Sequence, residues 1–198
     1  GSCAHQSARL TSDTEWQQTL GQWAGTPIIL LGEQHDQIAH HQWEGATVRH
    51  LAAQGRLAAL VVEMAPAGGS TRSLPASAND EEVKNALQWA QGGGPGGWPW
   101  QDYGPVVMAA VKAGVPVLGG NLPRIRMKQA MGESRYDAHL PAAGWQLQLD
   151  AIKDGHCGLL PESQFAPMAR IQLARDESMA RVTETAVREL GQPGKSVL

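Results

Sequence analysis

Two glutamates and a histidine follow apolar runs in this chain, and their side chains could bind a divalent metal or act as a general base. Glu33 and His35 come just after the aliphatic run 28–31, and Glu63 lies near the end of the apolar run 58–64. Two carboxylates and an imidazole are enough for a metal site, or for a general base with an orienting acid. The alternative is that these groups only cap helices and satisfy exposed backbone. Further potential ligands nearby are Asp36, His40 and His41.

A second group of side chains, further along the chain, could recognise an anionic cofactor. Arg124, Arg126 and Lys128 form a short run of cations, and another arginine directly precedes Tyr136. Guanidinium groups pair well with carboxylates, so this run could clamp the propionates of a haem, unless it is an ordinary solvated face. Haem iron accepts tyrosine, histidine, cysteine or methionine, and the neighbouring positive charge could favour the phenolate of Tyr136. Tyr103 is the only other tyrosine.

The turn Gly155-His156-Cys157-Gly158 presents an adjacent imidazole and thiol between glycines. No CxxC pair accompanies them, so a zinc site is not indicated. The side chains of neighbouring residues diverge, which argues against a catalytic Cys-His pair. His156 is a candidate haem ligand, with a helix-capping turn as the alternative.

The apolar runs that position these groups indicate strands, and their order along the chain indicates an α/β fold. The run 28–31 has four aliphatic residues, as expected of a strand buried on both faces of a parallel sheet. The runs 58–64 and 115–118 predict two more strands, and 196–198 predicts the beginning of a fourth. Alternation of strands with helices gives a mostly parallel sheet, and ligands bind at the carboxyl ends of its strands. We therefore expect one edge to carry Glu33, His35, Glu63 and Asn121.

Apolar periodicity and capping residues predict helices on both sides of these strands. The expected helices are 13–24, 36–54, 81–90, 105–113, 142–154 and 162–190. The second has Asp36 as N-cap and ends at Gly55, and the third has Asn79 or Asp80 as N-cap. The fourth begins at Pro105, and the last is expected to break near Pro167.

Two larger features of the chain follow from the same patterns. The aromatic residues 98–103 follow a glycine tract and could close over a ligand or simply cover the sheet edge. Strand signals disappear after Arg126. We therefore predict one sheet domain, residues 1–122 and 191–198, and a small helical subdomain, residues 123–190.

The composition is that of an ordinary soluble globular protein. It is 42% hydrophobic and 18% charged with a net charge of -3, and no basic stripe suggests nucleic acid binding. Cys3 and Cys157 are the only cysteines, which excludes a disulfide framework.

Gly1-Ser2 resembles a remnant of tag cleavage, which makes Cys3 the first native residue. A mature bacterial lipoprotein begins at such a cysteine. The alternative is that the chain boundary is arbitrary and that Cys3 is an ordinary thiol near it.

Several separated motifs, taken in order, resemble the ChaN-like haem-binding lipoproteins of bacterial iron uptake. This family belongs to a superfamily that includes the Tiki metalloproteases, the TraB proteins and the erythromycin esterases. The resemblance spans about residues 28–182. Its motifs are 31–36 (LGEQHD) with His40-His41, 62–64 (VEM), 100–105 (WQDYGP), 119–124 (GGNLPR), 156–161 (HCGLLP) and 172–180 (QLARDESMA).

The resemblance implies haem as ligand, a lipidated Cys3 and a periplasm-facing anchor, with the outer membrane as the expected location. In the family a tyrosine holds haem and dimerisation contributes, which favours Tyr136 and a homodimer here. The wider superfamily uses Gly-x-x-His and a downstream glutamate as metal-binding or catalytic groups, matched by Gly32 to His35 and by Glu63. A second Gly-x-x-His, expected near the C-terminus, is absent from this sequence, which weakens the enzyme hypothesis.

The leading hypothesis is therefore a haem-binding lipoprotein of iron acquisition. It places the propionates on Arg124, Arg126 and Lys128 and the iron on Tyr136 or His156, with Tyr103 as a further cofactor-binding residue. The alternative is a metal-dependent hydrolase that uses Glu33, His35 and Glu63. A lipid-tethered scaffold for a protein partner is the third hypothesis.

Overall fold

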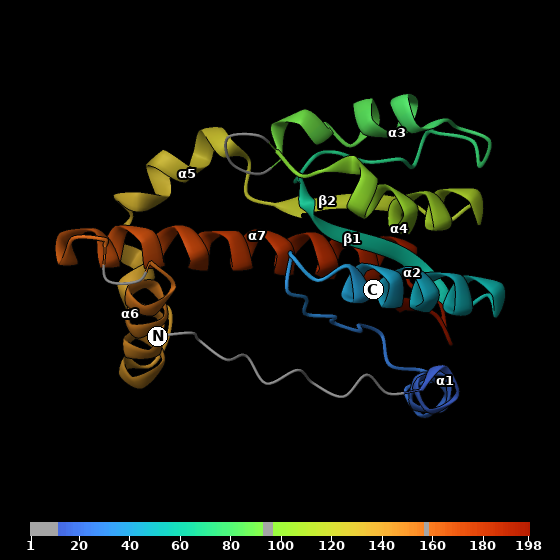
Figure 1. The fold of residues 1–198 in the computed structure, drawn as a ribbon, viewed down its shortest axis with the longest axis horizontal. Helices are drawn as coiled ribbons and strands as arrows, with labels where there is room; N and C mark the ends of the chain where they lie inside the picture. Colours follow the sequence, from blue (N-terminus) through green and yellow to red (C-terminus); the bar gives the residue numbers. More distant parts are fainter. Residues whose placement is uncertain (1–11, 93–96, 157–158) are drawn as a thin grey trace.

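A parallel sheet with helices on both faces forms the centre of the protein (Figure 1). The computed structural model describes residues 12–92, 97–156 and 159–198. Within these residues the sheet has three strands in the order β2-β1-β3. They are β1 (Leu57–Pro66), β2 (Val117–Asn121) and β3 (Ser196–Val197). The predicted α/β class is confirmed, and so is the short C-terminal strand.

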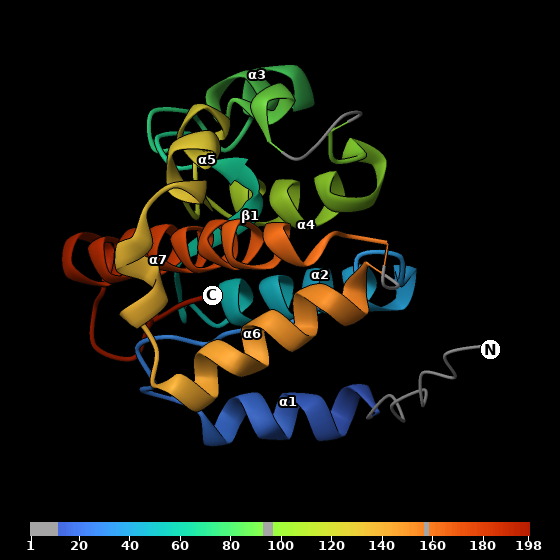
Figure 2. The same cartoon turned by 90° about the vertical axis from the view of Figure 1, so that its left-hand side faces the viewer.

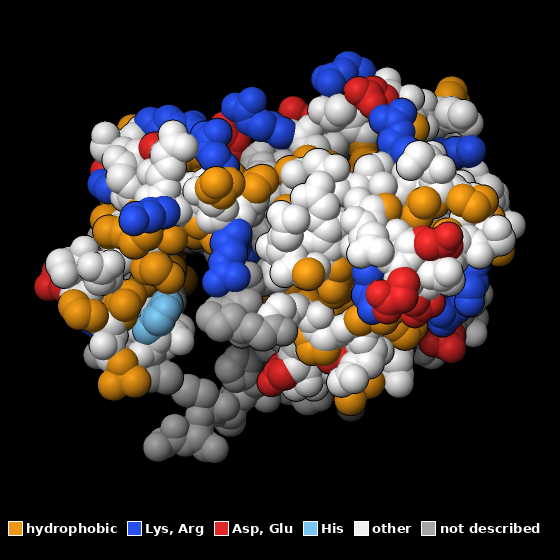
Figure 3. Space-filling view, turned by 90° about the horizontal axis from the view of Figure 1, so that it is seen from above, with side chains coloured by type: hydrophobic (Ala, Val, Ile, Leu, Met, Phe, Trp, Pro, Cys, Tyr) orange, Lys and Arg blue, Asp and Glu red, His pale blue; other side chains and the backbone are white. Residues whose placement is uncertain are grey.

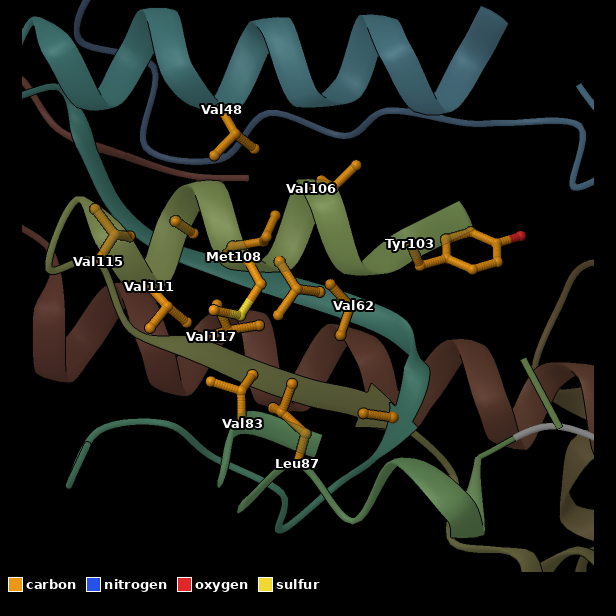
Figure 4. Close-up of a cluster of buried hydrophobic side chains, with 14 of the residues drawn as sticks. Val48, Val62, Val83, Leu87, Tyr103, Val106, Met108, Val111, Val115 and Val117 are labelled. Atoms are coloured by element: carbon orange, nitrogen blue, oxygen red, sulfur yellow. The ribbon is translucent and has the colours of Figure 1, made fainter. Parts of the chain in front are cut away.

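The central strand β1 is buried on both faces because nearly all of its side chains are apolar. Leu60 and Val62 face the main core, where Figure 4 shows Val62 among side chains that include Val48 of α2 (Ile38–Ala53) and Val106 of α4 (Trp100–Lys112). On the opposite face Val61 packs in a smaller core with Ala186. That residue belongs to α7 (Phe165–Leu190), which covers this side of the sheet.

The run 28–31 is not the doubly buried strand that its four aliphatic residues predict. Ile28 forms a single parallel bridge with Val197, and Leu30 is 83% exposed. Among the described residues, the partner of this run in the sheet is Val197 of β3, which bonds to the backbone of residues 27 and 29.

The N-terminal helix α1 (Asp13–Gln22) begins with a capping box between Ser12 and Glu15. It is held on α2 by Trp16, whose ring lies 4.5 Å from that of Trp43 and whose Nε1 donates to Thr47 Oγ1 at 2.8 Å. Three spaced apolar residues thus predicted this helix correctly.

Three helix predictions need correction near the start of the helix. The N-cap of α2 is Gln37 rather than Asp36. Helix α4 begins at Trp100 and contains Pro105, because the buried face of the helix compensates for the one amide that proline lacks. Helix α7 is unbroken at Pro167, since this residue lies in the first turn, where an amide needs no partner.

The remaining helices complete the fold. Helix α3 (Asp80–Ala86) is capped by Asn79, one of the two predicted caps, but it ends before the predicted residue 90, because Gln88 has a left-handed φ of 54° and precedes a separate 3-10 turn. Helix α6 (Ala142–Gly155) matches the predicted segment, whereas α5 (Arg124–Met131) was not predicted. Short 3-10 turns lie at Trp89–Gln91, Ser134–Ala138 and Glu162–Gln164.

Helix α7 runs along most of the molecule, and α5 and α6 lie at its N-terminal end (Figures 1 and 2). It packs against β1 and β2 as well as against α5 and α6. We call α5, α6 and the first half of α7 the helical end; the proposed division into domains remains a prediction. No helix among the described residues has the length and apolarity needed to span a bilayer.

Candidate functional site

A group of polar side chains surrounds Glu33 where the run 28–31 leads into α2. The Glu33 side chain is only 7% exposed, and its Oε1 lies 2.6 Å from His35 Nδ1. Its Oε2 lies 3.2 Å from His41 Nε2, although without hydrogen-bond geometry. Glu44 and Tyr103 complete this group, which we call the Glu33 cluster.

Aromatic rings cover the Glu33 cluster. The Tyr103 ring lies 4.5 Å from that of His41, and its hydroxyl is 3.5 Å from His35 Nδ1. The Trp98 ring lies 4.6 Å from His35 and 5.5 Å from Tyr103. The described part of the aromatic segment therefore packs on the sheet edge, while part of the glycine tract, residues 93–96, lies outside the described residues.

Burial and proximity shift the proton affinities within the Glu33 cluster. The pKa of Glu44 is raised to about 8, first by burial and then by the negative charge and hydrogen bond of Glu33. Burial and Glu33 also raise the pKa of Tyr103. Glu44 is therefore mostly protonated at neutral pH and can donate to Glu33. His35, half exposed and held by Glu33, is the member of the cluster that could act as a general base on a bound molecule.

Glu63 belongs to a separate network at the carboxyl ends of β1 and β2. It forms an ion pair with Arg175, whose Nε donates to Asn121 Oδ1 at 3.1 Å. Asn121 Nδ2 in turn donates to the Glu63 carbonyl at 3.0 Å. The predicted meeting of Glu63 and Asn121 is thus observed. Arg175 was missed because a cation in the middle of a long helix carries no sequence signal of its partner.

The described residues do not support the predicted divalent metal site. No group of three or more His, Cys, Asp or Glu side chains among them is arranged to hold a metal ion. Glu33 and His35 are in contact, but Glu63 is occupied by the guanidinium of Arg175.

The cations predicted to clamp propionates lie on the exposed surface of the helical end. Arg124, Arg126 and Lys128 are all exposed on α5, beside Ile125, which is 86% exposed. Helix α6 has no buried residue, and its Leu147 is 69% exposed. Figure 3 shows hydrophobic side chains gathered at one end of the molecule, with lysine and arginine side chains beside them.

Tyr136 lies inside the helical end rather than on its surface. It is 3% exposed, and its hydroxyl donates to Glu177 Oε2 at 2.8 Å. Burial and then Glu177 raise the pKa of Tyr136 to about 12. The positive charge of Arg135 lowers the pKa of Tyr136, as expected, but burial and Glu177 outweigh it, and Glu177 also pairs with Arg135 at 2.9 Å. The role of Tyr136 in haem ligation remains a prediction.

His156 is partly exposed and forms the C-cap of α6. Its Nδ1 lies 2.8 Å from the Ile152 carbonyl. Because a carbonyl only accepts, Nδ1 carries the hydrogen in this contact and Nε2 is the ring nitrogen left for a ligand. The neighbouring Cys157 lies outside the described residues, as does Cys3.

Comparison with known proteins places this architecture in a family. Residues 19–198 match the family model described as "Haem-binding uptake, Tiki superfamily, ChaN". The chain belongs to this ChaN family. The resemblance inferred from the separated motifs is therefore confirmed.

The ChaN fold is also supported by a solved structure. A chain described as "Cofacial heme binding to ChaN of Campylobacter jejuni" superposes with a TM-score of 0.67 at 22% sequence identity. The match covers 95% of this chain and 74% of that one, and it shows that the fold is shared. No curated protein matches the sequence.

Proposed function

We propose that this chain binds haem at its helical end and serves bacterial haem or iron acquisition as an envelope lipoprotein. The observation that carries the proposal is the match of residues 19–198 to the haem-binding uptake family. The helical end supplies what a porphyrin needs, namely exposed cations on α5 and exposed apolar side chains on α5 and α6. Haem would bring a redox-active iron, which the protein holds rather than transforms.

The cations of α5 suit the two propionates. Arg124 and Lys128 are four residues apart and therefore share a face of the helix, and Arg126 lies between them in sequence. Exposed Ile125 and Leu147 would contact the porphyrin ring. A carboxylate bound between guanidinium and ammonium groups gains charge-assisted hydrogen bonds.

Two side chains are candidates for the iron. His156 offers a free Nε2 on a partly exposed ring. Tyr136 would have to lose its proton and its hydrogen bond to Glu177 before its oxygen could bind iron. The arrangement therefore favours His156 in the first encounter, with Tyr136 available after a rearrangement.

Haemin titration followed by absorbance tests the proposal. We expect a saturable Soret band with a stoichiometric endpoint, and a changed band position in His156→Ala, in Tyr136→Phe, or in both. Phe retains most of the buried volume of Tyr136, and circular dichroism of each variant checks the fold. An unsaturable spectrum that neither substitution changes would contradict haem binding.

The lipid anchor and the homodimer are parts of the same proposal with tests of their own. Mass spectrometry of protein recovered from bacterial outer membranes should show an acylated Cys3, and Cys3→Ser should release the protein from the membrane fraction. Light scattering should detect a dimer when haemin is added, because exposed apolar side chains at the helical end would become covered. A monomer at saturating haemin contradicts the dimer.

The metal-dependent hydrolase is the weaker alternative. Only the contact between Glu33 and His35 favours it, and the described residues hold no group arranged for a metal ion. Stoichiometric metal after purification, together with a hydrolytic activity that His35→Ala removes, would support it.

A further inference from the structure

Helices α2 and α4 pack side by side (Figure 1), and a surface groove of about 280 Å³ lies between them. The α2 residues that line it recur every three or four positions and therefore share one face of the helix: Ile38, His41, Gln42, Gly45 and Arg49. Helix α4 contributes a matching face: Gln101, Asp102, Pro105 and Val106. We call this cavity the α2–α4 groove. No described residue of the helical end lines it, so it is separate from the proposed haem site.

Gly45 allows a cation to lie in the α2–α4 groove. The residue is buried, and a Cβ placed on it would lie 3.2 Å from Nη1 of Arg49. The guanidinium is therefore folded back over Gly45, toward the N-terminus of α2, instead of extending into solvent. Within residues 12–92, 97–156 and 159–198, Arg49 takes part in no ion pair. The groove thus holds a positive charge that no carboxylate of the described fold pairs with.

Asp102 brings the opposite charge into the same groove from the first turn of α4. Its half-buried carboxylate also forms no ion pair in the described part of the chain, so more than 4.0 Å separates it from the guanidinium nitrogens of Arg49. The positive end of α4 accounts for an acid at this position, but it does not account for a guanidinium folded into the same groove. Two opposite charges that share a groove without contact are complementary to a ligand that carries both.

Apolar side chains line much of the remaining groove. Ile38 is 67% exposed at the start of α2, and covering it with an apolar group would be favourable. Pro105 and Val106 of α4 also line the groove. A volume of about 280 Å³ lies at the lower limit for small-molecule pockets, so it suits a ligand much smaller than a porphyrin. The groove therefore fits a small molecule with one apolar group and two opposite charges.

We propose that the α2–α4 groove binds a free apolar α-amino acid, represented by L-leucine. The guanidinium of Arg49 donates to its carboxylate, Asp102 accepts from its ammonium group, and Ile38 contacts its side chain. A simple carboxylate or a simple amine would leave one charge of the groove without a partner. An α-amino acid carries both charges next to one carbon atom, whereas each residue added in a peptide moves the charged ends apart by up to about 3.5 Å.

Calorimetric titration of the full chain with L-leucine and its analogues tests the choice of ligand. We expect a dissociation constant of about 1 mM, because an open groove offers a small ligand few contacts. Leucinamide lacks the carboxylate and 4-methylpentanoate lacks the ammonium group, so each should bind about tenfold more weakly. Glycine, which lacks the apolar side chain, should also bind about tenfold more weakly. Equal affinity for any of these three, or for leucyl-leucine, would overturn the choice of an apolar amino acid.

Matched substitutions test the two charges. Arg49→Gln and Asp102→Asn should each weaken leucine binding about tenfold. Lys112→Gln and Glu184→Gln remove the same charges from exposed positions outside the groove and should leave the affinity unchanged. Circular dichroism checks the fold of each variant. If the controls weaken binding as much as the groove variants do, only net charge matters and the site is overturned.

NMR locates the bound amino acid. His41 lines the groove with 6% of its surface exposed, so the C–H signals of its ring should shift as leucine is added. The ring signals of His156, at the helical end, should stay in place. A shift at His156 without one at His41, or the absence of saturable binding up to about 20 mM leucine, would overturn the proposal.

Discussion

The Glu33 cluster and the helical end differ in how far their side chains are exposed. In the Glu33 cluster a buried carboxylate lies close to two imidazoles, and a phenol and a second carboxyl complete the group, although Glu33 Oε2 and both ring nitrogens of His41 have no hydrogen-bond partner among the described residues. At the helical end, three cations and several large apolar side chains face solvent. The sequence motif with the richest chemistry therefore lies in the more enclosed place. The difference teaches that a large ligand is more readily recognised by the region whose cations and apolar side chains face solvent.

The largest expected contrast comes from a matched pair of leucines. Leu51 is fully buried, so Leu51→Ala should lower the free energy of unfolding by about 2–5 kcal/mol. Leu147 is 69% exposed on α6, so Leu147→Ala should cost less than about 0.5 kcal/mol yet weaken haemin binding several-fold. Urea denaturation and haemin titration of both variants measure the two quantities. Equal destabilisation by the two substitutions would contradict the expected difference between the buried and the exposed leucine.

Charge reversal on α5 should come next in size. Changing Arg124, Arg126 and Lys128 together to glutamate should weaken haemin binding by about 10- to 100-fold, because each charge contact to a propionate contributes about 0.5–1 kcal/mol. The loss should shrink at high salt. A control with the same charge change uses Arg49, Lys112 and Arg188, which are exposed on other helices. If the control lowers affinity equally, the cations act only through net charge.

Glu44 should make the Glu33 cluster sensitive to alkaline pH. Its pKa is raised to about 8 in the folded protein, so between about pH 4.5 and 8 the folded state holds a proton that the unfolded state has lost. The contribution of Glu44 to stability therefore falls as pH rises through this window. We expect Glu44→Gln to flatten the dependence and raise the melting temperature at pH 8 by about 3 °C relative to wild type. An unchanged difference between pH 5 and pH 8 would contradict this.

The smallest effect is expected at Glu177, which lies within the helical end. Hydrogen bonds from Arg135, Arg181 and Tyr136 lower its pKa to about 2, so its contribution to stability is present above about pH 4.5 and is lost as pH falls toward 2. Glu177→Gln should remove that acid-dependent loss, which we expect to be under about 1 kcal/mol. It should also lower the pKa of Tyr136, read from tyrosinate absorbance. An unchanged tyrosinate titration would mean that burial alone sets this pKa.

The fold was predictable wherever one short pattern fixes one element. The spacing of Trp16, Leu20 and Trp23 along one face of a helix predicted α1. The β-branched run in 58–64 predicted β1. The run 28–31 failed because its partner in the sheet, β3, lies at the other end of the sequence, and no local pattern reveals that pairing. Helix α5 was missed because its charged and apolar residues show almost no helical periodicity.

The site was predictable where its contacts are local, and where the ends of neighbouring parallel strands meet, as for Glu63 and Asn121. Glu33 and His35 are two residues apart, and their proximity could be anticipated. Arg175 and Glu177 act on Glu63 and Tyr136 from far away in sequence, so their effects needed the three-dimensional structure. The pKa of Tyr136 illustrates this limit, because the adjacent arginine was visible in the sequence and the distant carboxylate was not.

Helix α7 connects the helical end mechanically to the carboxyl ends of β1 and β2. Its 26 residues make a rod about 39 Å long, anchored at Arg175 to the end of the sheet and at Arg170 to Asp137 within the helical end. A tilt of about 5° around Arg170 would move Arg175, about 7.5 Å further along the helix, by about 0.7 Å. A porphyrin that wedges against the first turns of this helix would therefore shift the cation that pairs with Glu63, without any contact between the ligand and the sheet.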